Sequence, residues 1–525
     1  MNTIHTYTKM AGLVLRAAGF VVAALAGSAQ AAAPGITGPV FDLVAAPGFI
    51  TQPDGASIYS WGYGCNSGPA GFAPATIAGK CTNGQMQLPG PTLVVREGDT
   101  VQVTLTNKLP VAAGNTSILF PGFDVTATGG VPGLLSQEAG ASNCATPGCN
   151  SVVYTFTAST PGTHSYYSGT QGDLQVEMGL FGALIVLPMN VPAVCSSTTP
   201  VGMAQMVDRG SGTPQDFRLA KAAFDHESSC YDREYLIQLS ELDPRIHNQA
   251  LAQSNLACTT ATGCMLIDTE PYHPVYFLAN GRSMPDTADP NYAPQYPLQP
   301  YNGNPHMHPG EVTLVRMIGQ GRLQHPFHEH ASHLRVLARD GNMLLSTNNK
   351  LAGPLLFTTT TTPGQTIDAL FQWTGKGLNW DVYGHAAGVT PDMCVPDANG
   401  FYTSVPSAYN FYEWCGDHGK ALESRPFGNV GSGGPVTLPD ANILINGAWY
   451  SGAPYLGPEA NARAVGLTPI PPSGTVANDP GSEAGFAFMW HSHNEREITT
   501  NNIFPGGMMM MMLVDPWVYL INEAN

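Results

Sequence analysis

Charged side chains are scarce in this chain of 525 residues, because Asp, Glu, Lys and Arg together make up only 11%. An average soluble protein contains about 25%. Positive charge is the scarcer sign: 21 Lys and Arg stand against 38 Asp and Glu, which gives a formal net charge of −17. A surface with this excess of negative charge repels phosphate backbones. We therefore expect no nucleic acid among the partners.

Long helical patterns and long apolar runs are also missing. The 59 Gly and 44 Pro residues interrupt helices and favour turns, which excludes coiled coils and disfavours helix bundles. Beyond the N-terminal region we find no apolar run long enough to cross a hydrocarbon core of about 30 Å. We therefore expect no membrane span in the mature chain.

The first 31 residues are typical of a secretory signal peptide. Lys9 and Arg16 precede an apolar stretch at residues 17–25, and Ala29-Gln-Ala31 supplies the small residues of a cleavage site. The alternative is a membrane anchor, but the apolar stretch is too short for one. We predict an exported protein, either periplasmic or extracellular.

All ten cysteines follow this segment, and an even number in an oxidising compartment predicts disulfide bonds. The candidate pairs are neighbours in the sequence: Cys65–Cys81, Cys144–Cys149, Cys258–Cys264 and Cys394–Cys415. The sequence does not establish the connectivity, and the alternative that some are buried free thiols stays open.

Short apolar or alternating segments separated by turn residues predict β-strands throughout the chain. The first two lie within residues 91–107, around a turn at 97–99. The others cover residues 152–157, 179–186, 234–240, 275–278, 312–318, 334–338, 366–372, 486–493 and 508–514. Many short strands bounded by Gly and Pro favour an all-β fold of sandwich domains.

Two short motifs hold six of the histidines. The first runs from His325 through His328 and His330 to His333, and the second is His491-Ser-His493. Side chains alternate across a strand, so each H-x-H pair places two imidazoles on one face. His325 has the opposite parity to His328 and His330. Two such pairs on neighbouring strands would direct four imidazoles to one point, which suits copper or zinc. The alternative is a hydrogen-bonded structural cluster.

These motifs, with their surroundings, resemble the multicopper oxidases. His325-Pro-Phe-His-Glu-His330 matches the third copper motif of that family, and His491-Ser-His493 followed by Gly507-Met-Met resembles the fourth. Residues 88–101 resemble the opening of the first domain, and residues 179–186 resemble the strand that frames the second motif. The resemblance implies copper as cofactor and tandem cupredoxin-like Greek-key β-sandwiches. We expect three, at residues 40–190, 195–375 and 376–525.

The resemblance also implies roles for single residues. His325 corresponds to a type 1 copper ligand, His328 to a type 2 ligand, and His330, His491 and His493 to type 3 ligands. However, Ser492 stands where the family has the type 1 Cys, and a hydroxyl cannot replace a thiolate in a blue copper site.

Further positions depart from the family pattern. Glu497 occupies the place of a second type 1 His, and the first-domain histidine motifs read Leu119-Phe-Pro-Gly122 and Tyr167-Ser-Gly169. Four family ligands of the trinuclear cluster are therefore absent.

Other candidate metal ligands have simpler interpretations. His306-Met-His308 is a third H-x-H pair, but a pair flanking a turn explains it as well. The thioethers of Met508–Met512 suit Cu(I), although a packed strand is the simpler interpretation. Cys415-Gly-Asp-His418 has the spacing of metal ligands, yet Cys394 is a ready disulfide partner for Cys415.

Three functions follow from these observations. The first is an exported copper-dependent oxidoreductase that resembles multicopper oxidases but has a reduced, His-ligated copper cluster. It would use a small-molecule or metal-ion reductant, with dioxygen as the further candidate partner. The second is a non-catalytic cupredoxin scaffold that binds or buffers copper. The third is a zinc or structural site in an interaction protein. The substrate and the oligomeric state do not follow from the sequence.

Overall fold

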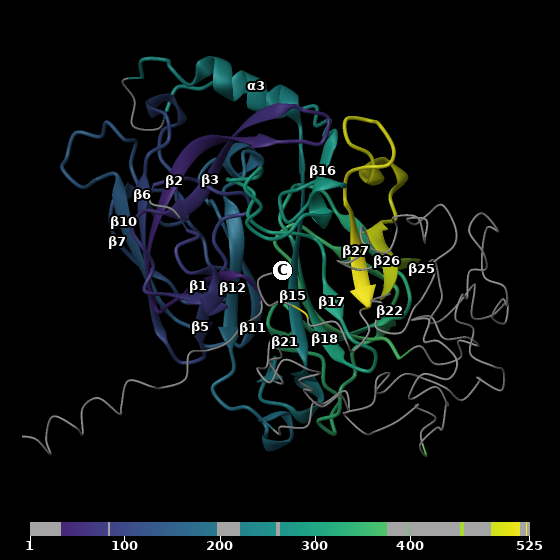
Figure 1. Cartoon of the computed structure of the whole chain (residues 1–525). Helices are drawn as coiled ribbons and strands as arrows, with labels where there is room; N and C mark the ends of the chain where they lie inside the picture. Colours follow the sequence, from purple (N-terminus) through teal and green to yellow (C-terminus); the bar gives the residue numbers. More distant parts are fainter. Residues whose placement is uncertain are drawn as a thin grey trace, which may run out of the picture. The chain divides into compact units, whose positions relative to one another are not determined.

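The computed structural model describes residues 33–81, 84–196, 221–258, 263–374, 398, 452–455, 485–514 and 521 (Figure 1). Residues 1–31, which the sequence predicts to be a signal peptide, lie outside these residues, as do Cys394 and Cys415. The described residues are mostly strands with few helices, so the predicted all-β class is confirmed.

The first sandwich contains two sheets of five strands. In sheet order, one consists of β11 (Gly162–Tyr167), β12 (Phe181–Leu187), β5 (Leu93–Arg96), β1 (Gly35–Thr37) and β4 (Gly71–Ala73). The other consists of β3 (Ser57–Cys65), β2 (Val40–Thr51), β6 (Thr100–Asn107), β10 (Ser151–Thr157) and β7 (Thr126–Gly129). Both sheets mix parallel and antiparallel pairs.

Alternation explains how these strands build a core. In β6, Val101, Val103 and Leu105 are buried while the residues between them are more exposed. They pack against residues of the opposite sheet such as Leu93 and Leu184. One face of each strand is thus apolar, and two such faces bury each other.

The second sandwich also has two sheets. The first, here called the inner sheet, runs β16 (Tyr276–Ala279), β15 (Arg233–Leu242), β18 (Val312–Gly319), β24 (Thr366–Gln372), β20 (Leu334–Arg339) and β21 (Asn342–Met343), with β22 (Leu355–Leu356) beside β20. The second, called the histidine sheet, runs β17 (His306–Met307), β27 (Met509–Val514), β26 (Gly485–Ser492), β19 (His325–Glu329) and β23 (Thr358–Thr361), with β25 (Gly452–Tyr455) beside β26.

The remaining elements are short. Two small ladders pair β8 (Val131–Pro132) with β9 (Gln137–Glu138) and β13 (Lys221–Ala222) with β14 (Cys230–Tyr231). The helices are α2 (Gly172–Gln175) and α3 (Pro244–Gln253). The side chain of Asp243 caps α3 by accepting from the Arg245 N–H, and Pro244 takes the first turn, where it needs no backbone donor. No described helix has the length and apolarity that a membrane span requires.

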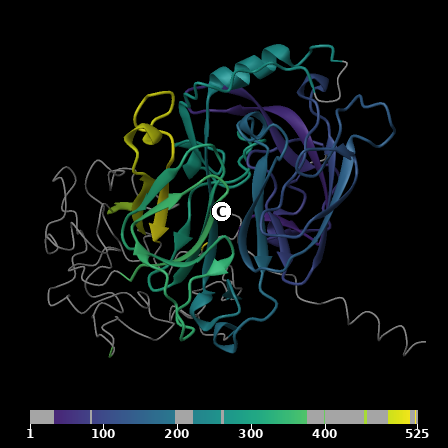
Figure 2. The ribbon, with the colours of Figure 1, turned by 180° about the vertical axis from the view of Figure 1, so that it is seen from behind.

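The histidine sheet joins segments that are distant in the sequence. Both views show β26 and β27, in yellow, beside the green strands of the second sandwich (Figures 1 and 2). Most of the predicted third domain, residues 376–525, lies outside the described residues, so that domain division stays a prediction. Its last two strands, however, complete the second sandwich through the pairing of β26 with β19.

The disulfides match the sequence prediction in part. Cys65–Cys81 and Cys144–Cys149 are bonded as predicted. A third bond, which the sequence analysis did not propose, joins Cys195 to Cys230 across 35 residues. Cys258 and Cys264 are not disulfide-bonded, so the predicted bridge between them is wrong for this structure.

Candidate metal centre

Two antiparallel strands place four histidines on one face of the histidine sheet. In the pairing of β19 with β26, His328 lies directly opposite His491. Residues directly opposite each other point to the same face of a sheet. His493 follows two residues after His491, and His330 two residues after His328, so alternation keeps both near that face. The pairing thereby unites two motifs that are 161 residues apart in the sequence.

The four imidazoles form a close cluster. Ring centroids lie 4.9 Å apart for His328 and His330, 5.6 Å for His328 and His491, and 4.9 Å for His328 and His493. The rings of His330 and His491 are 5.1 Å apart, and those of His491 and His493 are 5.8 Å apart. Nε2 of His491 lies 3.3 Å from Nε2 of His330.

The contact between His330 and His491 fits two ligands of one metal ion. Two nitrogens that each bind a metal at about 2.0–2.1 Å in tetrahedral geometry lie about 3.3–3.4 Å apart. Within the described part of the chain, no group of three or more His, Cys, Asp or Glu side chains has the geometry of a single ion site. His328 and His493 would therefore have to rotate to bring their nitrogens to the same ion. The exposure of His493 leaves its ring room to do so.

Neighbouring groups orient these rings. Nδ1 of His491 lies 2.7 Å from the carbonyl oxygen of Ser492, which can only accept, so Nδ1 carries the proton and Nε2 the lone pair. Nδ1 of His328 lies 2.8 Å from the hydroxyl of Thr358. Partners of this kind are the ones that fix the tautomer of metal-binding histidines.

Electrostatics favours the neutral form of these rings. Burial, together with the neighbouring His491 and His493, lowers the pKa of His328 to about 4. Burial also lowers the pKa of His491. A metal binds the neutral imidazole, so these rings need not lose a proton at neutral pH before they bind an ion.

His325 is not brought to this cluster. It lies on the opposite face of β19, fully buried, with Nε2 2.8 Å from Glu241 and Nδ1 2.9 Å from Glu497. Burial lowers the pKa of His325, but the hydrogen bonds to Glu241 and Glu497 outweigh it and raise the pKa to about 9. His325 is therefore an imidazolium held between two carboxylates, with both ring nitrogens engaged.

Ser492 and Glu497 complete a buried polar network around His325, which we call the His325 network. The hydroxyl of Ser492 donates to Oε2 of Glu497, and the Asn494 side chain donates to Oε1. The three positions that correspond to type 1 copper ligands thus do lie together. They offer an imidazolium, a hydroxyl and a carboxylate rather than a thiolate and two neutral imidazoles, so they do not fit a type 1 copper.

Sequence analysis missed Glu241, the fourth member of the His325 network. It comes from β15 and accepts hydrogen bonds from the backbone N–H groups of Arg322 and Leu323, at 2.6 and 2.9 Å. No spacing motif links it to the histidines. The only signal was a carboxylate directly after the strand predicted at residues 234–240.

The other candidate histidines lie apart from the cluster. His308 packs against Arg233 and Glu311 in a buried ionic group, and Nε2 of His306 accepts from Asn304. In the first sandwich, Leu119 is bridged to Tyr167. Residues 415–418 lie outside the described residues.

Comparison with known proteins bears on the first sandwich. Residues 74–190 match the family described as multicopper oxidase. This domain belongs to the multicopper oxidase family. Members of that family bind copper, as the resemblance implied. The matched domain contains β5 to β12, whereas all four clustered histidines lie in the second sandwich.

Individual proteins are similar to parts of this chain. Laccase 1 of Metarhizium acridum is 37% identical over 110 residues, which are 20% of this chain and 16% of that protein. L-ascorbate oxidase of Brassica rapa subsp. pekinensis is 38% identical over 100 residues, 19% of this chain and 16% of that protein. The alignments thus span about a sixth of these multicopper oxidases. Blue copper oxidase from Nitrosomonas europaea is 15% identical with a TM-score of 0.42, covering 90% of this chain and 85% of that chain.

Proposed function

We propose that this protein is an exported copper-dependent oxidoreductase whose copper is held by His328, His330, His491 and His493, without a blue copper site. The observation that carries the proposal is the pairing of His328 with His491, which gathers four imidazoles on one face. When bound, copper supplies one-electron chemistry between a small-molecule or metal-ion reductant and dioxygen. The family of the first domain supports copper over zinc.

The residues of the chain have separate tasks in this proposal. His330 and His491 provide two nitrogens already spaced for one ion. Thr358 and the Ser492 carbonyl hold the rings of His328 and His491. The partial exposure of His491 and the exposure of His493 leave the site open to a small reductant. Electrons would therefore reach the site directly, without a type 1 copper.

Three disulfides support the proposed location. The described residues include the bonds Cys65–Cys81, Cys144–Cys149 and Cys195–Cys230. Such bonds persist in oxidising compartments and are rare in the cytosol. Together with the signal-like residues 1–31, they favour export to the periplasm or the extracellular space.

One observation favours a second candidate, a non-catalytic copper-binding scaffold. The matched multicopper oxidase domain has Leu119-Phe-Pro-Gly122 and Tyr167-Ser-Gly169 where family members have histidine motifs. A site with half of its ligands retains the ability to bind copper more readily than the ability to reduce dioxygen. Copper-dependent oxygen uptake separates the two candidates.

The deciding experiment measures copper content and dioxygen uptake of the copper-loaded mature protein with an aromatic reductant. We expect near-stoichiometric copper, no intense blue absorption, and uptake that disappears when the copper is chelated. Copper without uptake would favour the scaffold. Zinc bound in preference to copper would contradict both.

A double variant tests the ligands themselves. His491→Ala with His493→Ala should lose most of the bound copper, because it removes both imidazoles supplied by β26. His273→Ala is the matched control, since His273 is an exposed histidine remote in sequence from both motifs. Unchanged copper content in the double variant would contradict the assignment of these histidines as copper ligands.

A further inference from the structure

The face that carries the histidine cluster continues onto the next strand. β27 is antiparallel to β26, and Met509 lies directly opposite His491 while Met511 lies opposite Met489. Because His328 in turn lies opposite His491, three strands contribute one cross-strand row: His328, His491 and Met509. Directly opposed residues share a face, with Cβ atoms about 4.5–5.5 Å apart.

Alternation divides the run Met508–Met512 between two environments. Met508, Met510 and Met512 are 0–1% exposed and belong to the core of the second sandwich. Met509 and Met511 point to the other face, where Met489 joins them from β26. Met489 and Met511 are only half-buried, and Met509 is 6% exposed. Packing in the core therefore accounts for three of the methionines but not for this second set.

The second set has the properties of a soft-metal site. Thioether sulfur prefers Cu(I) to harder divalent ions. Methionine has three rotatable side-chain bonds, so sulfurs on directly opposed and diagonal positions, with Cβ atoms within about 8 Å, can turn toward one ion. Three thioethers are neutral ligands, which suits a singly charged ion better than a divalent one.

We propose that Met489, Met509 and Met511 form a binding site for monovalent copper beside the histidine cluster. His491 stands at the border between the two sites, opposite Met509. The thioether site is distinct from the proposed histidine site and does not depend on it, because it uses different donors and a different oxidation state. Cu(I) bound at these methionines would lie next to the clustered histidines, which can bind Cu(II) as well as Cu(I).

The test titrates metal-free mature protein with Ag(I), a redox-inert probe for Cu(I), after its free thiols have been blocked with N-ethylmaleimide. Blocking is needed because Cys258 and Cys264 are not disulfide-bonded. The test variant carries Leu at Met489, Met509 and Met511. The matched control carries Leu at the core-facing positions of the same run: Met508, Met510 and Met512. Leu preserves the volume of Met, so both variants should fold.

We expect the test variant to lose one equivalent of Ag(I), or to bind it at least tenfold more weakly, while the control binds like the unaltered protein. X-ray absorption of the Ag(I)-loaded unaltered protein should show sulfur neighbours. Equal binding by the test variant and the control would overturn the proposal. If both variants unfold, the X-ray absorption spectrum of the unaltered protein decides. Silver surrounded only by nitrogen and oxygen would also overturn the proposal.

A third variant separates this inference from the proposed function. His491→Ala with His493→Ala should lose Cu(II), measured by electron paramagnetic resonance, but keep thioether-bound Ag(I). If the unaltered protein binds no Cu(II) at the histidines, the proposed function fails while the thioether site stands. If Cu(II) binding is normal and Ag(I) binding is independent of the three methionines, only the thioether site fails.

Discussion

At the scale of the residue, the environment shifts the pKa values of two neighbouring histidines in opposite directions. His325 and His328 belong to the same short strand, yet alternation sends them to different faces. His325 lies between Glu241 and Glu497, which raise its pKa to about 9 against the effect of burial. Burial and the neighbouring imidazoles of His491 and His493 lower the pKa of His328 to about 4. One histidine is thus a charged member of the core, and the other is ready to bind a metal.

The raised pKa of His325 predicts how stability depends on pH. Its folded pKa of about 9 exceeds the unfolded value of 6.5, so its contribution is complete below pH 6.5 and is lost as the pH rises through 9. In that window the loss approaches about 1.4 kcal/mol per pH unit. Urea denaturation of the unaltered protein and of His325→Gln should show this slope only in the former. Parallel pH profiles would contradict a charged His325.

The same network predicts the outcome of restoring the missing cysteine. Copper-loaded Ser492→Cys should remain without intense blue absorption, because Glu241 and Glu497 still occupy both ring nitrogens of His325. Adding Glu497→His and Glu241→Leu should release His325 and allow the colour to develop. Absorption spectra of the two variants decide, and a blue single variant would show that the His325 network yields to copper.

At the scale of the element, β26 and β27 combine a core face and a ligand face. Trp490 lies in the core, with its ring 5.0 Å from that of Phe371, and it faces Met510 across the ladder. On the other face the same strand presents His491. Because the side-chain period is two, a slip of one residue would move every ligand into the core. The packing of Trp490 in the core therefore determines the face of the histidine sheet to which His491 and His493 point.

Two alanine substitutions test this register. Met510→Ala should destabilise the protein by about 2–5 kcal/mol, the usual cost of truncating a buried side chain. Met511→Ala should cost much less, because that side chain is half-buried on the other face. Thermal and urea unfolding of both variants provide the measurement. Similar costs for the two substitutions would mean that the alternation described here is wrong.

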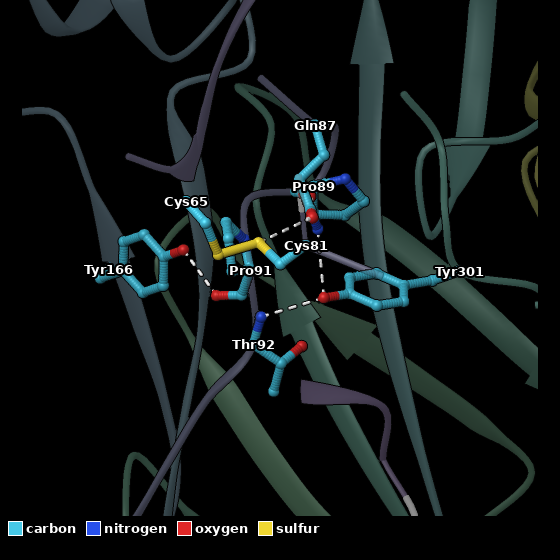
Figure 3. The surroundings of a disulfide bond; sticks show 8 residues. All are labelled: Cys65, Cys81, Gln87, Pro89, Pro91, Thr92, Tyr166 and Tyr301. Carbon is cyan, nitrogen blue, oxygen red and sulfur yellow. Dashed lines mark hydrogen bonds between the residues drawn. A yellow bond between two sulfur atoms is a disulfide. The ribbon is translucent and has the colours of Figure 1, made fainter. Parts of the chain in front are cut away.

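At the scale of the whole molecule, hydrogen bonds tie the two sandwiches together. Tyr301 accepts hydrogen bonds from the Thr92 backbone and the Gln87 side chain, near the Cys65–Cys81 disulfide (Figure 3). A second contact is fully buried: Arg316 pairs with Asp368 and Glu234. Asp368 also accepts from Thr163 in β11 of the first sandwich. The contact is polar and specific rather than purely apolar.

Removing Asp368 should weaken the whole molecule. In Asp368→Ala, buried Arg316 keeps only one carboxylate partner and Thr163 loses its two hydrogen bonds to Asp368, so we expect a loss of about 3–5 kcal/mol. Thr163→Val removes only the hydroxyl and should cost about 1 kcal/mol. Urea unfolding of both single variants and of the double variant tests this. Costs that simply add would mean that Asp368 does not act through Thr163.

Local sequence patterns were sufficient to predict individual strands and the face on which each histidine lies. The alternation of residues 100–107 and 152–157 predicts β6 and β10, and the H-x-H spacing predicts a shared face for each histidine pair. The odd spacing of His325 already separates it from His328. These features depend on the period of a single strand, which a short stretch of sequence contains in full.

The sequence by itself indicated the all-β class, many of the strands, two cysteine pairs that the structure confirms, the resemblance to multicopper oxidases and the opposite parity of His325. Only the tertiary structure decided that β26 pairs with β19, that Glu241 approaches His325, and that Met509 stands opposite His491. The physical reason is the distance along the sequence over which each effect acts. Strand alternation is local, whereas pairing and burial join segments that are distant in the sequence, such as those of His325 and Glu497, which are 172 residues apart. Which strands pair depends on how whole apolar faces pack against each other, and a single sequence motif does not contain that information.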